Sequence, residues 1–314
     1  MKRFPRFFVW CSILFFPIFC WASEPLKIGT LLIEDVVPMY VAEKEGLYSR
    51  VGVEVELIPF LSALERDSAL TAGAIDGALS DPIGAILLDQ GRNLIKITSL
   101  SLGKSPKEGV FAILAAPGAG VTRVEELKGV AIGISNSTII EYVTDRMLLE
   151  QGFSASEIKK IEIKKMPIRM QMLLSGAIKA ATLPEPLASI AAAKGAVRIL
   201  ADNQTKESLS QTVLIFRNQA LDNRKDDITR FFTAYGQAVE LINKQPEQYR
   251  SLFVEKGRIP PNLAQSYPIP SYPPPQPFPQ SLYTPVIDWL TQKGDVEPVA
   301  YEYMVSQDFL PQVP

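Results

Sequence analysis

The feature that most constrains the fold is a regular alternation, from Leu26 onward, of short apolar runs with longer segments of helical periodicity. Apolar runs of about four to eight residues predict buried strands, and the periodic segments between them predict helices. Strands separated by helices are typical of βαβ units, so the sequence predicts an α/β protein with mostly parallel sheets. The predicted strands are Leu26–Leu32, Val53–Phe60, Gly77–Ser80, Leu94–Leu100, Val110–Ala115, Val130–Ile134, Lys160–Ile163, Ala180–Thr182, Val197–Leu200 and Thr212–Phe216.

The alternation is interrupted once and then starts again. The Pro- and Gly-containing segment Ala116–Gly120 follows the fifth predicted strand, and a new series of strands and helices begins at Val130. This restart predicts a second α/β lobe. We assign residues 23–115 and 213–314 to the first lobe and residues 116–212 to the second. The predicted helices Asp226–Asn243, Glu247–Glu255 and Leu282–Lys293 have no sheet of their own, so we expect them to pack on the first lobe.

Residues 1–22 have the pattern of a secretory signal peptide. Lys2, Arg3 and Arg6 precede the uncharged run Phe7–Phe19, and Ala22 offers a small residue for cleavage. The run is shorter than the roughly 20 apolar residues that a membrane span needs. We therefore expect export to the periplasm or another extracytoplasmic space. An uncleaved anchor and lipid attachment at Cys20 are the alternatives.

Composition excludes several classes of chemistry. The chain has no histidine, and its 2 cysteines, Cys11 and Cys20, both lie in the predicted signal peptide. Catalytic triads with histidine, cysteine nucleophiles and His- or Cys-ligated metals are thereby excluded from the mature chain. The 32 basic residues balance 34 acidic ones, which gives no footprint for nucleic acid. We expect a binding protein without catalytic residues, cofactor or metal.

A proline-rich segment lies near the carboxyl end of the chain. Nine prolines occur between Ile259 and Gln280, a density that excludes helix or central strand. We expect an extended connection whose Tyr267 and Tyr272 pack on the first lobe. A recognition arm is the alternative.

Candidate binding residues follow from the topology. In two-lobed α/β proteins, ligands lie outside the carboxyl ends of the strands, where the following helices begin. Arg169 begins a helix of the second lobe, where a surface ion pair is expected, and helix packing is expected for Tyr142. The candidates are Asp35, Tyr40 and Asp81 in the first lobe and Ser135, Asn136, Ser137, Thr138 and Glu185 in the second.

Each candidate also has a structural explanation. Helix capping explains Asp81 as well as ligand binding does. Capping is also the alternative for the Ser135–Thr138 turn, but it needs only one of those four residues. The three carboxylates favour an amine or amidine on the ligand, whereas the hydroxyl cluster favours an anion or another hydrogen-bonding oxygen. Both alternatives stay open, and together they predict a polar ligand that bears a donor.

Four stretches of the sequence resemble a known family: Asp35–Phe60, Leu70–Ala78, Val124–Gly133 and Ala181–Pro186. They are similar to substrate-binding proteins of ABC transporters in the sulfonate, nitrate, taurine and thiamine-pyrimidine-precursor group. The resemblance implies a two-lobe periplasmic-binding-protein fold, the venus flytrap, with crossings between the lobes near Ala116 and Ser210.

The resemblance also implies a function. We expect a monomer that captures a small molecule, either an amine-bearing heterocycle or a sulfonate-like anion, and delivers it to an ABC permease. An extracytoplasmic sensory domain or enzyme on the same scaffold is the alternative. The fungal enzymes of this fold use their own histidine, and this chain has none.

Overall fold

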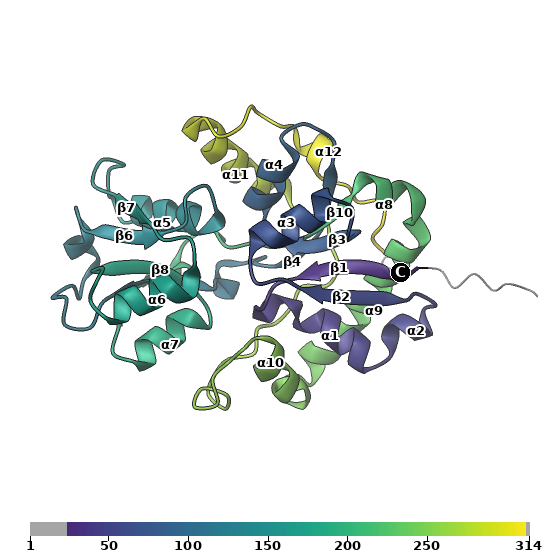
Figure 1. Ribbon diagram of the computed structural model, residues 1–314, viewed down its shortest axis with the longest axis horizontal. Coiled ribbons are helices and arrows are strands. Elements are labelled where there is room, and N and C mark those ends of the chain that lie inside the picture. Colours follow the sequence, from purple (N-terminus) through teal and green to yellow (C-terminus); the bar gives the residue numbers. More distant parts are fainter. Residues whose placement is uncertain (1–23, 312–314) are drawn as a thin grey trace, which may run out of the picture.

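The protein is a two-lobe α/β structure in which each lobe is built on one five-stranded sheet (Figure 1). The computed structural model describes residues 24–311, so the predicted signal peptide and Cys20 lie outside the described residues. The first sheet has the order β2-β1-β3-β10-β4, and β10 is its antiparallel member. Its strands are β1 (Leu26–Thr30), β2 (Val55–Pro59), β3 (Gly77–Ser80), β4 (Ile95–Leu102) and β10 (Thr212–Arg217).

The second sheet repeats this arrangement with the order β7-β6-β8-β5-β9, and here β5 is the strand that runs antiparallel to its neighbours. The two-lobe fold with mostly parallel sheets is therefore confirmed. The strands of this sheet are β5 (Phe111–Ala115), β6 (Ala131–Ile134), β7 (Lys159–Glu162), β8 (Ala180–Pro184) and β9 (Val197–Ala201).

The strand pairing moves one predicted lobe boundary. β5 pairs with β8 and β9, so it belongs to the second sheet and not to the first lobe, where residues 23–115 placed it. The chain thus crosses between the lobes before Phe111, and Ala116–Gly120 lies inside the second lobe. The sequence pattern misled because a Pro- and Gly-containing break marks a turn but does not say which sheet the preceding strand joins. The second crossing lies between β9 and β10, which includes Ser210 as expected.

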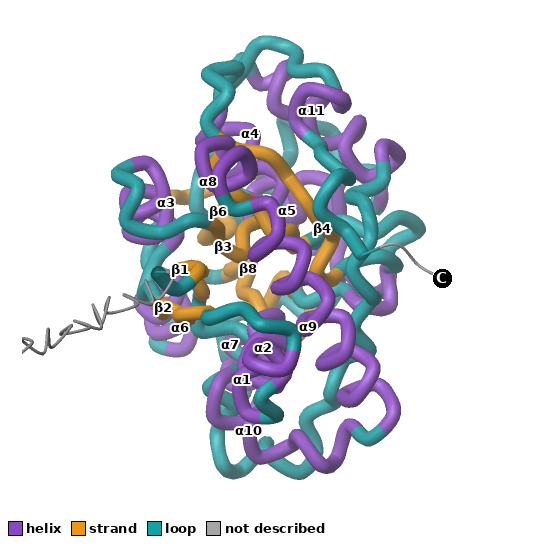
Figure 2. Tube along the Cα trace, turned by 90° about the vertical axis from the view of Figure 1, so that its right-hand side faces the viewer, coloured by secondary structure: helices purple, strands orange, loops and turns teal. Residues whose placement is uncertain are grey.

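Helices cover both sheets, and the carboxyl-terminal helices pack on the first lobe as predicted. In the first lobe α9 lies along α1 and α2, which Figure 2 shows from the side of that lobe. The helices are α1 (Val37–Lys44), α2 (Leu47–Arg50), α3 (Ala63–Thr71), α4 (Pro82–Asp89), α5 (Ile139–Glu150), α6 (Met166–Leu174), α7 (Leu187–Ala193), α8 (Asn218–Asn223), α9 (Lys225–Lys244), α10 (Arg250–Lys256), α11 (Gln280–Lys293) and α12 (Tyr301–Met304).

Helix α9 shows why the tail docks where it does. Its apolar residues recur every three or four positions, which places them on one face of the helix. That face is buried against the first sheet and α1. The buried residues of the helix are Ile228, Phe231, Phe232, Ala234, Tyr235, Ala238, Val239 and Ile242.

One apolar core runs from the first lobe into the second. It joins Ile86 of α4 and Ile287 of α11 to Tyr142 and Val143 of α5. The ring of Tyr142 packs edge-on against Trp289 of α11 with centroids 5.5 Å apart, so this tyrosine has the packing role expected of it. The tail therefore holds the second lobe as well as the first.

The proline-rich segment lies on the first lobe, as expected. It is not extended throughout, because residues 261–267 form turns in which the backbone nitrogen of Tyr267 donates to the carbonyl oxygen of Leu263 at 2.8 Å. We call residues 259–279 the proline strap. Tyr267 and Tyr272 are 6% and 1% exposed, and the amide of Asn243 on α9 donates to the carbonyl oxygen of Tyr272 at 2.8 Å. The backbone of Gln276 pairs with Leu100 of β4. In residues 24–311, no helix combines the length and apolar character needed to cross a membrane.

The two crossing segments touch at Gly109. A Cβ atom there would lie 2.5 Å from the backbone nitrogen of Asn203 and 2.7 Å from the carbonyl carbon of Asp202. We expect Gly109→Ala to lower the free energy of unfolding by about 1–3 kcal/mol, because backbone atoms on both sides must shift. Urea unfolding measures this. The control is Gly84→Ala, whose nearest contact is the flexible Ser80 side chain at 3.3 Å. Equal effects of the two variants would contradict the close approach.

Candidate functional site

The segment after β1 buries two adjacent carboxyl groups at the carboxyl edge of the first sheet. Glu34 and Asp35 form the start of a 3-10 helix, and they are 5% and 2% exposed. The hydroxyl of Tyr267 donates to Glu34 Oε2 at 2.7 Å, and the hydroxyl of Thr212 donates to Asp35 Oδ2 at 2.7 Å. The hydroxyl of Tyr272 donates to the carbonyl oxygen of Glu34 at 2.8 Å. Neutral groups from two distant segments therefore hold both carboxyls.

Burial dominates the acidity of this pair. Desolvation, with help from Asp35 and Glu185, raises the pKa of Glu34 to about 8, and the hydrogen bond from Tyr267 opposes it. Desolvation likewise raises the pKa of Asp35 to about 6 against the hydrogen bond from Thr212. Glu34 is therefore mostly protonated at neutral pH.

Glu185 of the second lobe faces this pair. It follows β8, and its charge contributes to the raised pKa values of both Glu34 and Tyr267. Its carboxylate also has partners in its own lobe. Oε1 accepts from Arg198 at 2.6 Å, and Oε2 accepts from the backbone nitrogen of Ser189 at 3.0 Å. Glu34, next to the predicted candidate Asp35 and within reach of the charge of Glu185, is a residue that the sequence analysis missed.

Asp81 lies at the start of α4, where its Oδ1 accepts from the backbone nitrogen of Gly84 at 2.8 Å. Desolvation raises its pKa, opposed by this hydrogen bond and by the charge of Arg66. The capping role that the sequence allowed is present. Tyr40 on α1 is half-buried, and the ammonium of Lys256 lies 4.6 Å from its ring centroid.

The Ser135–Thr138 turn is held by hydrogen bonds within the protein. Thr138 Oγ1 accepts from the backbone nitrogen of Ile140 and caps α5, while it donates to the carbonyl oxygen of Ser135. Ser137 has a positive φ of 53°, and its backbone nitrogen donates to Glu141 at 2.6 Å. Asn136 is the exposed member of the turn.

Arg169 is buried, which corrects the expectation of a surface ion pair. It is 0% exposed, and no carboxylate of the described residues lies within 4 Å of it in an ion pair. Instead it donates to the carbonyl oxygens of Thr182 and Ile163 and to Ser135 Oγ. Burial lowers its pKa to about 10. Backbone carbonyl oxygens accept the hydrogen bonds that a carboxylate partner would otherwise accept. A hydropathy pattern does not predict such backbone acceptors.

The first lobe has an equivalent arginine, which the sequence analysis also missed. Arg66 is 1% exposed and donates to the carbonyl oxygen of Leu79, as Arg169 does to that of Thr182. A Cβ atom on Gly29 would lie 3.3 Å from Arg66 Cγ, and one on Gly133 would lie 3.3 Å from Arg169 Cγ. The signal was available in the sequence, since each arginine precedes a Gly-Ala-Ile segment by seven residues.

An ionic cluster joins the second lobe to α11. Glu141 on α5 accepts from Lys160 at 2.7 Å and from Lys293 at 2.8 Å, and Lys293 also donates to Ser137 and Asp295. Desolvation acts to raise the pKa of Glu141, but the two lysines together hold it below its usual range. Ser137 therefore contributes to the lobe contact and does not stand free toward a ligand.

Removing one lysine tests this contact. We expect Lys293→Met to lower the free energy of unfolding by about 1.5–3 kcal/mol, because a buried carboxylate loses a charged hydrogen-bond donor. The matched control is Lys244→Met, which removes a lysine that is 72% exposed and 3.5 Å from Glu240. Urea unfolding of both variants gives the difference. A loss no greater than that of the control would show that Lys160 alone satisfies Glu141.

The pH dependence of stability tests the buried pair. The pKa of Glu34 is raised on folding. Its contribution to the free energy of unfolding is therefore complete below about pH 4.5 and is lost as the pH rises through 8. Stability should fall between pH 6 and 8 by at most about 1.4 kcal/mol per pH unit. Glu34→Gln should remove this slope, as measured by thermal unfolding at fixed salt. Asp35 and Asp202 have pKa values of about 6, so the decrease in stability that they cause at lower pH should persist in the variant. That decrease serves as the internal control.

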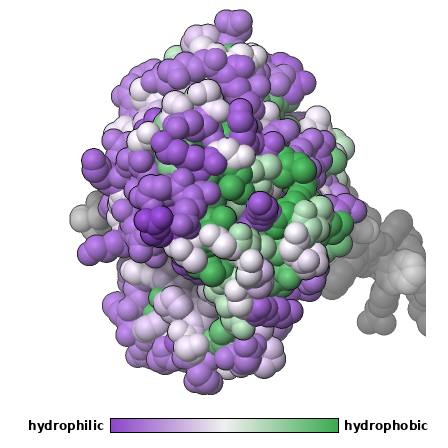
Figure 3. Space-filling model, turned by 90° about the vertical axis from the view of Figure 1, so that its left-hand side faces the viewer, coloured by the Kyte–Doolittle hydropathy of each residue, from purple (hydrophilic) through white to green (hydrophobic). Residues whose placement is uncertain are grey.

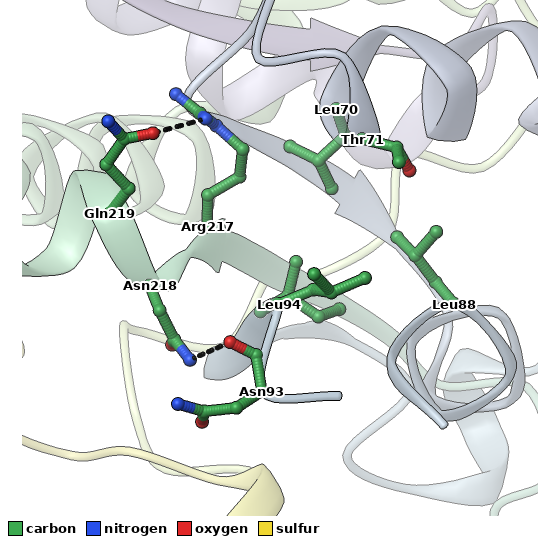
Figure 4. Close-up of a pocket in the computed structure, with 9 residues that line it drawn as sticks. Leu70, Thr71, Leu88, Asn93, Leu94, Arg217, Asn218 and Gln219 are labelled. Atoms are coloured by element: carbon green, nitrogen blue, oxygen red, sulfur yellow. Dashed lines mark hydrogen bonds between the residues drawn. The ribbon is translucent and has the colours of Figure 1, made fainter. Parts of the chain in front are cut away.

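A separate cavity of about 210 Å³ lies at the opposite edge of the first sheet, where β4 begins and β10 ends (Figure 4). Leucine side chains form its apolar wall, and Arg217 donates to Gln219 Oε1 at 3.0 Å beside it. None of the predicted site residues lines this cavity. Within residues 24–311, no three acidic, histidine or cysteine side chains are grouped to hold a metal ion.

Comparison with known proteins places the chain in a family. A family model described as NMT1/THI5 like matches residues 34–249, which is more than half of the chain. No curated protein matches it. This match covers the 3-10 helix with Glu34, the second lobe and α9.

Solved structures share the fold at low sequence identity. The ligand-binding component of an ABC-type import system from Staphylococcus aureus, with zinc bound, has a TM-score of 0.77 at 19% identity, over 91% of this chain and 98% of that chain. The periplasmic aliphatic sulphonate binding protein SsuA from Escherichia coli has a TM-score of 0.72 at 18% identity, over 91% and 93%. The desulfurization enzyme DszB has a TM-score of 0.69 at 13% identity, over 91% and 97%.

Proposed function

Because the chain belongs to the NMT1/THI5-like family, we propose that it is the extracytoplasmic solute-binding component of an ABC import system. It takes a small polar molecule between its two lobes and delivers it to a membrane permease. The observation that carries this proposal is the buried carboxyl pair Glu34 and Asp35 after β1, because the charge of Glu185, which follows β8 in the other lobe, acts on Glu34. A ligand bound there contacts both lobes and so favours their closed arrangement.

The predicted site residues keep distinct roles in this proposal. Asp35 and Glu185 contribute negative charge to the binding region, and Tyr40 flanks it on α1. Asp81 and Thr138 shape the edges as helix caps, and Ser135 does so through its hydrogen bond from Arg169. The exposed side chain of Asn136 offers an amide. Ser137 acts indirectly, since it is bonded into the ionic cluster with Asp295 and Lys293. We propose that the protein acts as a monomer, without cofactor, metal or nucleic acid.

Fold alone does not separate binding proteins from enzymes here. Similar solved structures include transport binding proteins, and DszB shares the fold as an enzyme. We propose the binding function because the carboxyl pair, Arg169 and the serines of the turn are held by hydrogen bonds within the protein. Histidine and, after the proposed signal-peptide cleavage, cysteine are absent as nucleophiles.

Exposed apolar side chains at equivalent places on the two lobes support a protein partner. Leu61 and Leu64, before and in the first turn of α3, are 80% and 78% exposed, and Ile168 in the first turn of α6 is 50% exposed. Figure 3 shows the second lobe from its outer end, with apolar side chains gathered in one area of a mostly hydrophilic face. We propose that the starts of α3 and α6 contact the permease.

The double variant Leu61→Ser/Leu64→Ser separates delivery from binding. We expect at least a tenfold loss of ATP-dependent uptake in vesicles that contain the permease, with ligand affinity unchanged by calorimetry. Leu241→Ser on α9, where the leucine is 36% exposed, is the matched control and should transport normally. Native mass spectrometry of the purified protein identifies the ligand to use. Undiminished uptake would exclude this docking surface, and conversion of the ligand to a product would overturn the binding function.

A further inference from the structure

The charge of the ligand can be inferred from what the buried carboxyls lack. Glu141 is neutralised by two lysines, but Glu34 and Asp35 form no ion pair with any residue in 24–311. Hydroxyl groups are their side-chain donors. Glu34 is 95% buried, since 5% of it is exposed, and the hydrogen bond from Tyr267 reaches Oε2 alone.

The second lobe adds negative charge on the same side. The charge of Glu185 acts on Glu34 and on Tyr267, so the two lobes present carboxyl groups to one region. Arg198 pairs with Glu185 but is 35% exposed, which leaves that pair partly in solvent. Arg169, the buried cation of this lobe, donates to Ser135 Oγ and to backbone carbonyl oxygens, and it forms no ion pair with these carboxyl groups.

The proline strap completes this region from a distant part of the chain. Its Tyr267 and Tyr272 bond the side chain and the backbone of Glu34. The strap is fixed in turn, because Arg250 on α10 donates to the carbonyl oxygens of Ala264 and Tyr267 at 2.9 Å. Prolines limit the backbone freedom of the strap, so the tyrosine hydroxyls are held in place before a ligand arrives.

Resting on the proposed function, we propose that the ligand is a cation whose ammonium or amidinium group binds Glu34, with the proline strap orienting that carboxylate. A sulfonate-like anion is disfavoured because it would meet the negative charge of Asp35 in the first lobe and of Glu185 in the second. The cation supplies the counter-charge that Glu34 and Asp35 lack in the protein, and tyrosine rings beside them suit a cation. This names the ligand class that the sequence left open between amine and anion.

Binding of a cation is coupled to the release of a proton from Glu34. Glu34 is mostly protonated at pH 7, and it ionises when a cation binds, so its proton passes to solvent. The groups that face Glu34 are Asp35 beside it, Tyr267 and Tyr272 on the strap and Glu185 of the second lobe. On α10, which packs against the same 3-10 helix, Lys256 lies over the ring of Tyr40 and pairs with Glu255.

The experiment uses the mature chain, stripped of retained ligand, and a panel of small compounds matched in shape but not in charge. Benzylamine, benzyl alcohol and phenylmethanesulfonate form one such set, and further ammonium and amidinium compounds extend it. We expect cations alone to raise the melting temperature. Calorimetry at pH 7 in two buffers of different ionisation enthalpy should show release of about one proton per cation. Binding of sulfonates, or of no cation in the panel, would overturn the proposal, as would binding without proton release.

Variants assign the effect to Glu34. Glu34→Gln should weaken cation affinity about 10- to 100-fold, the range expected when a charged partner is lost from a buried hydrogen bond. Glu56→Gln on β2, an exposed glutamate, is the matched control and should change nothing. Tyr267→Phe removes a bond that lowers the pKa of Glu34, so the pH at which cations bind half-maximally should rise. An unshifted pH profile would reduce Tyr267 to a structural role and contradict the strap's part.

The outcomes also distinguish this inference from the proposed function. Mass spectrometry of the molecule released from freshly purified protein gives its charge directly. A retained anion that supports uptake would overturn the cation and leave the import function standing. Conversely, a cation that binds through Glu34 but is not taken up with the permease would support the ligand class and contradict import.

Discussion

The rest of the structure depends on the two contacting chain crossings between the lobes. The chain enters the second lobe after β4 and returns after β9, and each sheet receives one antiparallel strand at a crossing, β5 or β10. Asp202 holds the crossings together, because its Oδ1 accepts from the backbone nitrogen of Phe111 at 2.9 Å. The carboxyl ends of the parallel strands of both sheets can thereby face one another, which places Glu34 near Glu185.

Most of the secondary structure could be predicted from the sequence because it follows from local patterns. Each predicted strand corresponds to a strand of the structure, and α9 shows its buried face in the spacing of Phe231, Tyr235 and Ala238. The sheet that β5 joins could not be predicted in this way. A strand's apolar pattern records burial but not its partner, and the partner here lies in residues 180–184 and 197–201.

The candidate site residues stay a prediction, and the sequence analysis did not include Glu34 among them. Strand ends gave Asp35 and Glu185, yet the pKa of Glu34 is raised further than that of Asp35. Its burial depends on Tyr267 and Tyr272, which lie more than 230 positions along the chain. No local pattern connects a glutamate after β1 to tyrosines in a proline-rich segment. The signal that was available is the pair of adjacent acids directly after an apolar strand.

The two buried arginines show how one arrangement was used differently in the two lobes. Both guanidinium groups bond a carbonyl at the end of a central strand, but Arg66 lies 2.7 Å from Asp67, whereas Arg169 has Ser135 in place of an acid. The first lobe thus neutralises its arginine locally, whereas Glu34 and Asp35, like the buried Asp89 on α4, have no ion pair among the described residues. The second lobe keeps a buried positive charge, Arg169, whose three guanidinium nitrogens all donate to oxygens of the protein. The charge that a ligand must supply is therefore set by the first lobe, while the second fixes the hydroxyl-bearing turn that begins α5.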